Sequence, residues 1–435
     1  MYNNFKLKNG LRVVTEYIDH VNSISVGVMV QNGSRNEDIS VNGISHFIEH
    51  MFFKGTEKRS AKDIVQEIEN VGGQINAYTS KEVTCYYIKA LNTHLKLSID
   101  ILSDMIINSK FDEEEIKREQ GVVIEEINMS EDSPEDVLDN DASKAIFLDN
   151  PLSYPILGSI ENIKSFNRKK IKDFIKSHYT PNNSVISICG KFDEKEIINI
   201  LEEYFGEWEA DREYTPKYET PILTSGSKYT NKQIEQLHIN LAFKGLPYAH
   251  EKSYSLVLLN NIFGGGASSV LFQKVREELG LCYTIYSYGQ PYLGVGINNI
   301  YTGVSKKYAE KALSVINDEL KNFAKNGITK ELLEINKEKI KANYILGLES
   351  TSSRMFANAK NMLLQNKIKT QEEVIKRINN INGDDINYVL DTCFKPGIIS
   401  SAYVGQDIDY EKLNHIIEPN IKAYDNSSLE GVSRV

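Results

Sequence analysis

Hydrophobic and polar positions along the chain follow two periods, which predict a mixture of strands and helices. Residues 5–17 hold two apolar-rich stretches around Asn9-Gly10, a pair typical of a tight turn, and predict a hairpin. Residues 21–30 are rich in β-branched side chains and predict a further strand. Residues 74–80 and 84–90 predict two antiparallel neighbours, and the segments between these strands keep helical spacing.

The second half of the chain repeats features of the first half. Three residues of the first half recur with the same spacing in the second: Gln66, Gly73 and Ser80 match Gln273, Gly280 and Ser287. Each half also ends in a helix, an aromatic-x-Pro triplet, a strand and a glycine. We therefore expect an α+β protein of two homologous domains, each a mainly antiparallel sheet with helices packed on it.

The boundaries of these domains follow from a polar stretch that contains Pro216, Pro221 and Gly226. We expect a first domain over residues 1–210, a linker over 211–232 and a second domain over 233–435.

The most informative stretch runs from Gly43 to Phe53. On a helix His46, Glu49 and His50 point to one side, and apolar residues cover most of the rest, which is typical of a buried helix. Buried imidazoles and a carboxylate need partners, and a divalent metal held by the two histidines supplies one. The H-x-x-E-H pattern favours zinc, with the carboxylate acting on a metal-bound water. The alternative is two core histidines bonded to backbone.

A strongly charged helix is predicted from Phe111 to Ile127. Its first carboxylates suit the helix dipole and need no further explanation. Glu126 lies seven residues after Glu119, so the two carboxylates share a face. Val122 and Ile127 lie near this face, so Glu126 is not simply a solvated charge.

Composition narrows the classes of function. A net charge of −10 argues against a nucleic-acid partner. The four cysteines lack C-x-x-C pairing, which favours reduced thiols over a disulfide framework or a cysteine zinc site. The first residues lack the apolar core of a secretory signal, and no long apolar run predicts a membrane span. We expect a cytoplasmic protein without a membrane partner.

These motifs resemble the insulinase/pitrilysin family of zinc metallopeptidases, and most closely its two-domain bacterial branch related to the mitochondrial processing peptidase. The resemblance extends from Leu7 to Gly405 and centres on G-I-S-H-F-I-E-H-M-F-F-K-G-T. It implies one zinc ion per chain, His46 and His50 as zinc ligands, and Glu49 as the general base.

The resemblance also implies a third zinc ligand at the end of an E-x6-E pattern, which gives Glu126, with Glu119 as a carboxylate that supports catalysis without binding the metal. Glu125 is a competitor for the ligand role, and the helical phase with Glu119 favours Glu126. The alternative for Glu119 is a solvated helix charge.

Substrate contacts are implied at two further places. The segment Gly73 to Tyr78 matches an edge strand on which the family binds the substrate backbone, here through Asn76 and Ala77. In the second half, Arg276 and Tyr283 match a pair that holds the substrate and stabilises the oxyanion.

Together these observations predict a zinc endopeptidase for peptides or unfolded polypeptides, and the resemblance implies a homodimer that encloses a chamber. One alternative is a catalytically silent peptide-binding or assembly subunit of the same fold. Another is a catalytic subunit that needs a different, non-catalytic partner chain.

Overall fold

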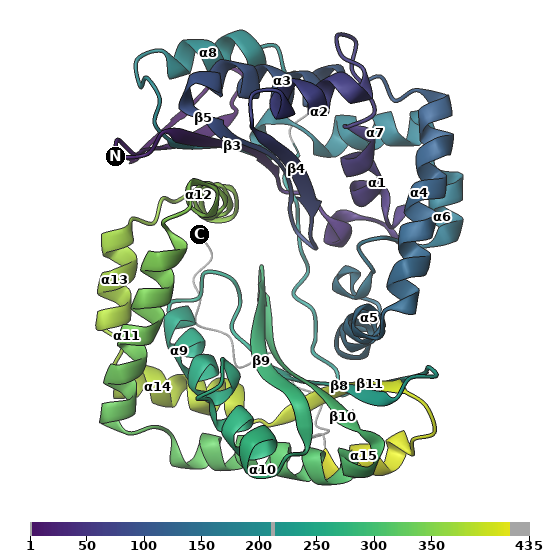
Figure 1. The fold of residues 1–435 in the computed structure, drawn as a ribbon, viewed down its shortest axis with the longest axis vertical. Coiled ribbons are helices and arrows are strands. Elements are labelled where there is room, and N and C mark those ends of the chain that lie inside the picture. Colours follow the sequence, from purple (N-terminus) through teal and green to yellow (C-terminus); the bar gives the residue numbers. More distant parts are fainter. Residues whose placement is uncertain (1, 210–213, 418–435) are drawn as a thin grey trace. The chain divides into compact units, whose positions relative to one another are not determined.

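Two β-sheets, each covered by helices, organise the chain in the computed structural model, which describes residues 2–209 and 214–417 (Figure 1). The chain divides into two compact units. The first unit contains the chain up to Asn128, together with Tyr154–Lys217 and Tyr344–Val374. The second unit contains Met129–Ser153, Tyr218–Asn343 and the chain from Ile375 onward.

The sheet of the first unit has six strands in the order β1-β2-β6-β3-β5-β4. Their bounds are β1 (Tyr2–Lys6), β2 (Arg12–Tyr17), β3 (Ser23–Val30), β4 (Gln74–Thr79), β5 (Thr84–Leu91) and β6 (Ser184–Gly190). All pairings are antiparallel except that of β2 with β6. The predicted hairpin at the start of the chain is confirmed as β1 and β2.

Both faces of this sheet are buried, because successive side chains of its strands enter different cores. Val13 and Tyr86 belong to the large core of the unit, whereas their neighbours Val14 and Cys85 pack against a separate helix, α12 (Thr351–Gln365). The other helices of this unit are α1 (Ile44–Met51), α2 (Ala61–Glu69), α3 (Leu95–Asn108), α4 (Glu113–Asp132), α6 (Ile160–Ser165), α7 (Arg168–His178) and α8 (Ile197–Phe205).

The sheet of the second unit has five strands in the order β7-β11-β8-β10-β9. They are β7 (Ser227–Asn231), β8 (Gln236–Lys244), β9 (Cys282–Tyr292), β10 (Val295–Ser305) and β11 (Ile398–Gly405). The helices are α5 (Pro134–Phe147), α9 (Ser253–Gly264), α10 (Ala309–Asn326), α14 (Gly383–Val389) and α15 (Tyr410–Ile417). The chain passes from one unit to the other near the end of α4 and within α11 (Lys330–Gly347) and α13 (Gln371–Asn379).

The predicted fold class, α+β with two mainly antiparallel sheets, is confirmed. The compact units differ from continuous sequence halves, because α5 packs on the second sheet and α12 on the first. Leu138 and Ala142 of α5 lie in one core with Ala402 and Val404 of β11.

The predicted linker over 211–232 needs a correction. Its end forms the strand β7, which pairs in parallel with β11, so this stretch is partly a structural element of the second unit. Residues 211–213 of the predicted linker lie outside the described residues.

Candidate metal centre

The start of helix α1 is held by Gly43 and by the buried side chain of Glu37. Gly43 has φ 98°, a conformation that favours glycine, and the next five residues are buried. The buried carboxylate of Glu37 accepts hydrogen bonds from the backbone N–H of Gly43 at 2.8 Å and of Ser45 at 2.7 Å. Glu37 thus satisfies donors that the start of a helix leaves unpaired.

The first unit brings His46, His50 and Glu126 together. Each offers one ligand atom within 4.8 Å of the others. Nε2 of His46 lies 3.7 Å from Oε1 of Glu126, and Nε2 of His50 lies 3.5 Å from its Oε2. Ligand atoms on a tetrahedral zinc ion lie about 3.3 Å apart, given bonds of about 2.0–2.1 Å, so the set fits one ion.

Glu119 and Glu125 take different positions around this group. Glu119 is buried, and its Oε1 lies 2.7 Å from Nδ1 of His50, the nitrogen that faces away from Glu126. Glu125 is exposed and is absent from the group of ligand atoms. The predicted preference for Glu126 over Glu125 therefore agrees with the geometry, and Glu119 is a buried partner of His50 instead of a solvated charge.

The contact between His50 and Glu119 selects a tautomer. When Nδ1–H donates to Glu119, Nε2 carries the lone pair that a metal needs. The second oxygen of Glu119 lies 2.6 Å from Nζ of Lys54. The site therefore has a positive side chain two contacts away from His50, with Glu119 between them.

Burial and neighbouring charge shift the titration of both histidines. Burial, and then the charge of His50, lower the pKa of His46 to about 3. Burial also acts to lower the pKa of His50, but the hydrogen bond and charge of Glu119 outweigh it and raise that pKa. Metal binding requires neutral imidazole, and at neutral pH the environment already keeps His46 neutral.

Glu49 lies on the same helix and contacts the sheet. Oγ1 of Thr79, at the end of β4, donates a hydrogen bond to Oε2 of Glu49 at 2.5 Å. Burial raises the pKa of the Glu49 carboxyl, and this hydrogen bond opposes the rise. A carboxyl with a raised pKa next to a candidate metal site is suited to accept a proton.

The strand β4 lies at the edge of its sheet and pairs with β5 alone among the strands that the structure describes. Asn76 is exposed, and its Oδ1 accepts a hydrogen bond from the backbone N–H of Ala77 at 2.8 Å. The strand that holds Glu49 through Thr79 therefore has a free edge, as the substrate-binding prediction for Asn76 and Ala77 requires.

Arg276 and Tyr283 belong to the second unit. Cζ of Arg276, on the π-helical turn Phe272–Glu278, lies 5.0 Å from the ring centre of Tyr283 at the start of β9. Tyr283 is 75% exposed, so it is not a core residue. The structure shows that the two side chains are neighbours, and their role in binding substrate stays a prediction.

Three residues around the site were not predicted as site residues: Glu37, Lys54 and Thr79. Lys54 follows His50 by four positions and Thr79 lies within a predicted strand, but only the folded chain brings them to Glu119 and Glu49. Buried Nδ1 of His46 has no hydrogen-bond partner among the described residues.

Comparisons with known proteins show the family to which the chain belongs. Residues 12–160 match the family Insulinase (Peptidase family M16), and residues 165–340 match the Peptidase M16 inactive domain. The chain is 42% identical over 391 residues to "Uncharacterized zinc protease YmxG" of Bacillus subtilis (strain 168), covering 89% of this chain and 94% of that protein. It is 35% identical over 405 residues to an "Uncharacterized zinc protease" of Rickettsia bellii (strain RML369-C), covering 93% and 97%.

Solved structures show the same fold. A protease from Helicobacter pylori superimposes with a TM-score of 0.84 at 22% identity, covering 93% of this chain and 99% of that chain. A peptidase M16 inactive domain from Pseudomonas fluorescens gives a TM-score of 0.85 at 16% identity, covering 94% and 98%.

Fold, metal-binding geometry and relatives define the class as that of two-domain, zinc-protease-like proteins. The chain belongs to the insulinase family, peptidase family M16. Within the described part of the chain, no helix combines the length and the apolar character that a membrane crossing requires.

Proposed function

We propose that this protein is a zinc-dependent endopeptidase that hydrolyses peptides or unfolded polypeptides. The observation that carries the proposal is the convergence of His46, His50 and Glu126 within 4.8 Å, with Glu49 on the same helix. The relatives named zinc proteases support both the metal and the reaction class.

His46, His50 and Glu126 would hold the zinc ion, which supplies Lewis acidity that polarises a carbonyl and makes water easier to deprotonate. Glu49 takes the proton from the attacking water and passes it to the leaving amine. Thr79 fixes the orientation of Glu49 by its hydrogen bond. Glu119 orients His50 through Nδ1.

The free edge of β4 supports the choice of substrate. An extended peptide adds to such an edge through backbone hydrogen bonds, which demand little of its sequence. Most of a folded domain is already held in its own helices and sheets and cannot extend along β4, so the proposal favours unfolded chains. Asn76 and Ala77 lie on this edge. When a substrate binds, the N–H of Ala77 leaves the side-chain oxygen of Asn76 and donates to a substrate carbonyl instead.

The proposal gives Tyr283 and Arg276 a share in the reaction. Tyr283 donates a hydrogen bond to the developing oxyanion, and Arg276 holds a substrate carbonyl. Their mutual contact and the exposure of Tyr283 support these roles.

The test is hydrolysis of a quenched fluorescent peptide by wild type and Glu49→Gln, with the bound zinc measured in both. We expect Glu49→Gln to keep its zinc and to lose activity by a factor of about 10² to 10⁴. Full activity of that variant would exclude Glu49 as the base. Zinc binding without hydrolysis by the wild type would favour the alternative of a silent peptide-binding subunit.

A homodimer with one zinc ion per chain, located in the cytoplasm, remains part of the proposal. Light scattering of the purified chain measures its mass in solution, alongside peptide turnover. An active homodimer agrees with the proposal, whereas a monomer that turns over peptide only with a second protein favours the dependent catalytic subunit.

A further inference from the structure

Lys54 lies in the turn that follows α1, four residues after His50. Its Nζ lies 2.6 Å from Oε2 of Glu119, while Oε1 of the same carboxylate lies 2.7 Å from Nδ1 of His50. The Glu119 side chain is 3% exposed, so these two contacts replace most of its hydration. Each oxygen of Glu119 thus has one partner, a cation on one side and an imidazole on the other.

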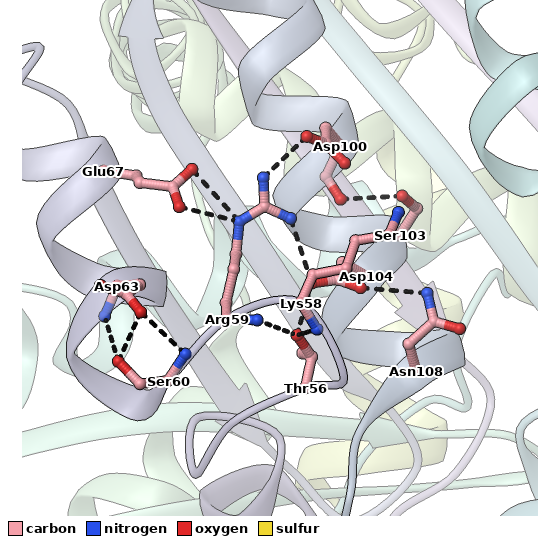
Figure 2. A network of polar contacts seen from close by, with 10 residues as sticks. All are labelled: Thr56, Lys58, Arg59, Ser60, Asp63, Glu67, Asp100, Ser103, Asp104 and Asn108. Atoms are coloured by element: carbon pink, nitrogen blue, oxygen red, sulfur yellow. Dashed lines mark hydrogen bonds and ion pairs between the residues drawn. The ribbon is translucent and has the colours of Figure 1, made fainter.

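The turn that carries Lys54 is fixed independently of the metal ligands. Figure 2 shows the Arg59 guanidinium among carboxylates, 2.7 Å from Asp100 and 3.0 Å from Asp104. Oγ1 of Thr56 donates to Asp104 at 2.6 Å and accepts the N–H of Arg59 at 2.9 Å. This network ties the turn to α3, so Lys54 is presented from a rigid part of the unit.

Two carboxylates of α4 lie near the imidazole of His50, one at each ring nitrogen. Glu119 and Glu126 share a face of the helix, and their oxygens lie 2.7 Å and 3.5 Å from the two nitrogens of His50. An unpaired buried carboxylate is costly. Without a cation beside it, Glu119 would lower this cost by rotating toward positive charge on the side where Nε2 of His50 and Glu126 meet. Lys54 provides that charge on the opposite side.

We infer that Lys54 is a positioning residue of the metal centre: it holds Glu119 on Nδ1 of His50 and thereby keeps Nε2 of His50 free to bind the ion. The inference rests on the proposed function for the identity of the ion. A ligating histidine usually donates its other N–H to a carboxylate, which here is Glu119. Lys54 adds one further residue to this chain, because its ammonium holds the carboxylate in place.

The first readout is the rate at which zinc leaves the protein in excess chromophoric chelator. Loss of an outer partner of a metal ligand typically weakens metal binding by about 10- to 100-fold, and we expect Lys54→Met to release zinc faster by about this factor. Lys54→Arg keeps the cation and should release zinc close to the wild-type rate. Lys58→Met, which removes an exposed lysine from the same turn, is the matched control and should leave the rate unchanged.

The second readout needs no metal. In chelated protein labelled with ¹⁵N-histidine, at a pH high enough for His50 to be neutral, the imidazole signals of His50, assigned with His50→Gln, should show a proton on Nδ1 in the wild type and mixed tautomers in Lys54→Met. A role confined to stability would lower the unfolding midpoint and leave these signals and the zinc release rate of the folded protein unchanged.

If Lys54 acts on His50 only through Glu119, its effect should disappear when Glu119 is changed. In a Glu119→Gln background, Lys54→Met should add no further acceleration of zinc release. Equal release by wild type and Lys54→Met, or no rescue by Lys54→Arg, would overturn the inference. If the wild type binds no zinc, the proposed function fails, and the ¹⁵N signals of the chelated protein still decide whether Lys54 controls the tautomer.

Discussion

At the residue scale, the hydroxyl of Thr79 is one of the groups that set the pKa of Glu49. Burial raises the pKa of the Glu49 carboxyl, and the bond from Thr79 opposes that rise. Thr79→Val removes the opposing contact, so the pKa should rise further and the acid limb of the profile of kcat/KM against pH should move to higher pH. Thr79→Ser keeps a hydroxyl and should keep the limb near its wild-type position; an unmoved limb in Thr79→Val would contradict the assignment.

His46 gives a prediction for the metal-free protein. Burial first, then the charge of His50, lower its pKa to about 3, whereas a histidine in an unfolded chain titrates near 6.5. Between these values the unfolded state binds more protons, so the free energy of unfolding should fall as the pH drops below about 6.5. The fall contributed by His46 is at most about 1.4 kcal/mol per pH unit.

Urea unfolding of chelated protein between pH 7 and pH 5 measures this dependence. The variant His46→Asn lacks the titrating group and should lose stability less steeply than the wild type. The same slope in both proteins would mean that His46 is not held neutral by the fold.

Sequence reasoning reached those site residues that are linked by the geometry of a single helix. His46, Glu49 and His50 lie on one helix face, so local spacing is sufficient for them. Glu126 as a ligand was implied by the family resemblance, and its helical phase with Glu119 only decided between Glu125 and Glu126. Thr79 comes from a strand, and its meeting with Glu49 depends on how α1 packs on β4. The spacing of hydrophobic and polar residues along the chain does not indicate this contact.

At the element scale, α1 depends on its buried cap. Glu37 accepts the backbone N–H groups of Gly43 and Ser45, and an unpaired buried donor costs roughly 1–3 kcal/mol. Glu37→Ala should therefore lower the free energy of unfolding by about 2–5 kcal/mol. The neighbouring exposed Asp38 provides the control, because Asp38→Ala should change stability by less than about 0.5 kcal/mol. Equal effects of the two variants in denaturant unfolding would refute the capping role.

The strand β7 shows why an element can look like a linker. Its five residues are exposed or half-buried, since β7 is an edge strand that pairs only with β11 among the described strands. A strand without a buried face lacks the alternation by which strands are recognised. The buried strand β11, by contrast, was predicted, because both halves of the sequence end in a helix, an aromatic-x-Pro triplet, a strand and a glycine.

At the scale of the whole molecule, each compact unit contains one helix from the other half of the sequence. The duplication predicted two domains, but α12 packs on the first sheet through contacts more than 300 residues apart, such as Arg354 with Glu16 (|i−j| = 338). Hydrophobic periodicity can indicate that a segment is a helix, but it does not indicate on which sheet that helix packs.

This exchange gives a stability prediction. Glu16 is 4% exposed and is bonded by Arg354 and, at 2.8 Å, by Asn358. Arg354→Met leaves a buried carboxylate without its cation and should destabilise the protein by about 3–5 kcal/mol. Lys395→Met breaks an exposed pair with Asp391 and should cost about 0–1 kcal/mol. Similar denaturant midpoints for the two variants would contradict the role of Arg354 in holding α12.

The central claim is that one ion is held by His46, His50 and Glu126, and a matched pair of substitutions tests it most directly. Glu125 and Glu126 are neighbours of equal charge, but only Glu126 reaches the histidines. Elemental analysis of the purified proteins should find one zinc per chain in wild type and in Glu125→Gln, and little in Glu126→Gln after dialysis against a weak chelator. Full zinc content in Glu126→Gln, or its loss from Glu125→Gln instead, would contradict the account.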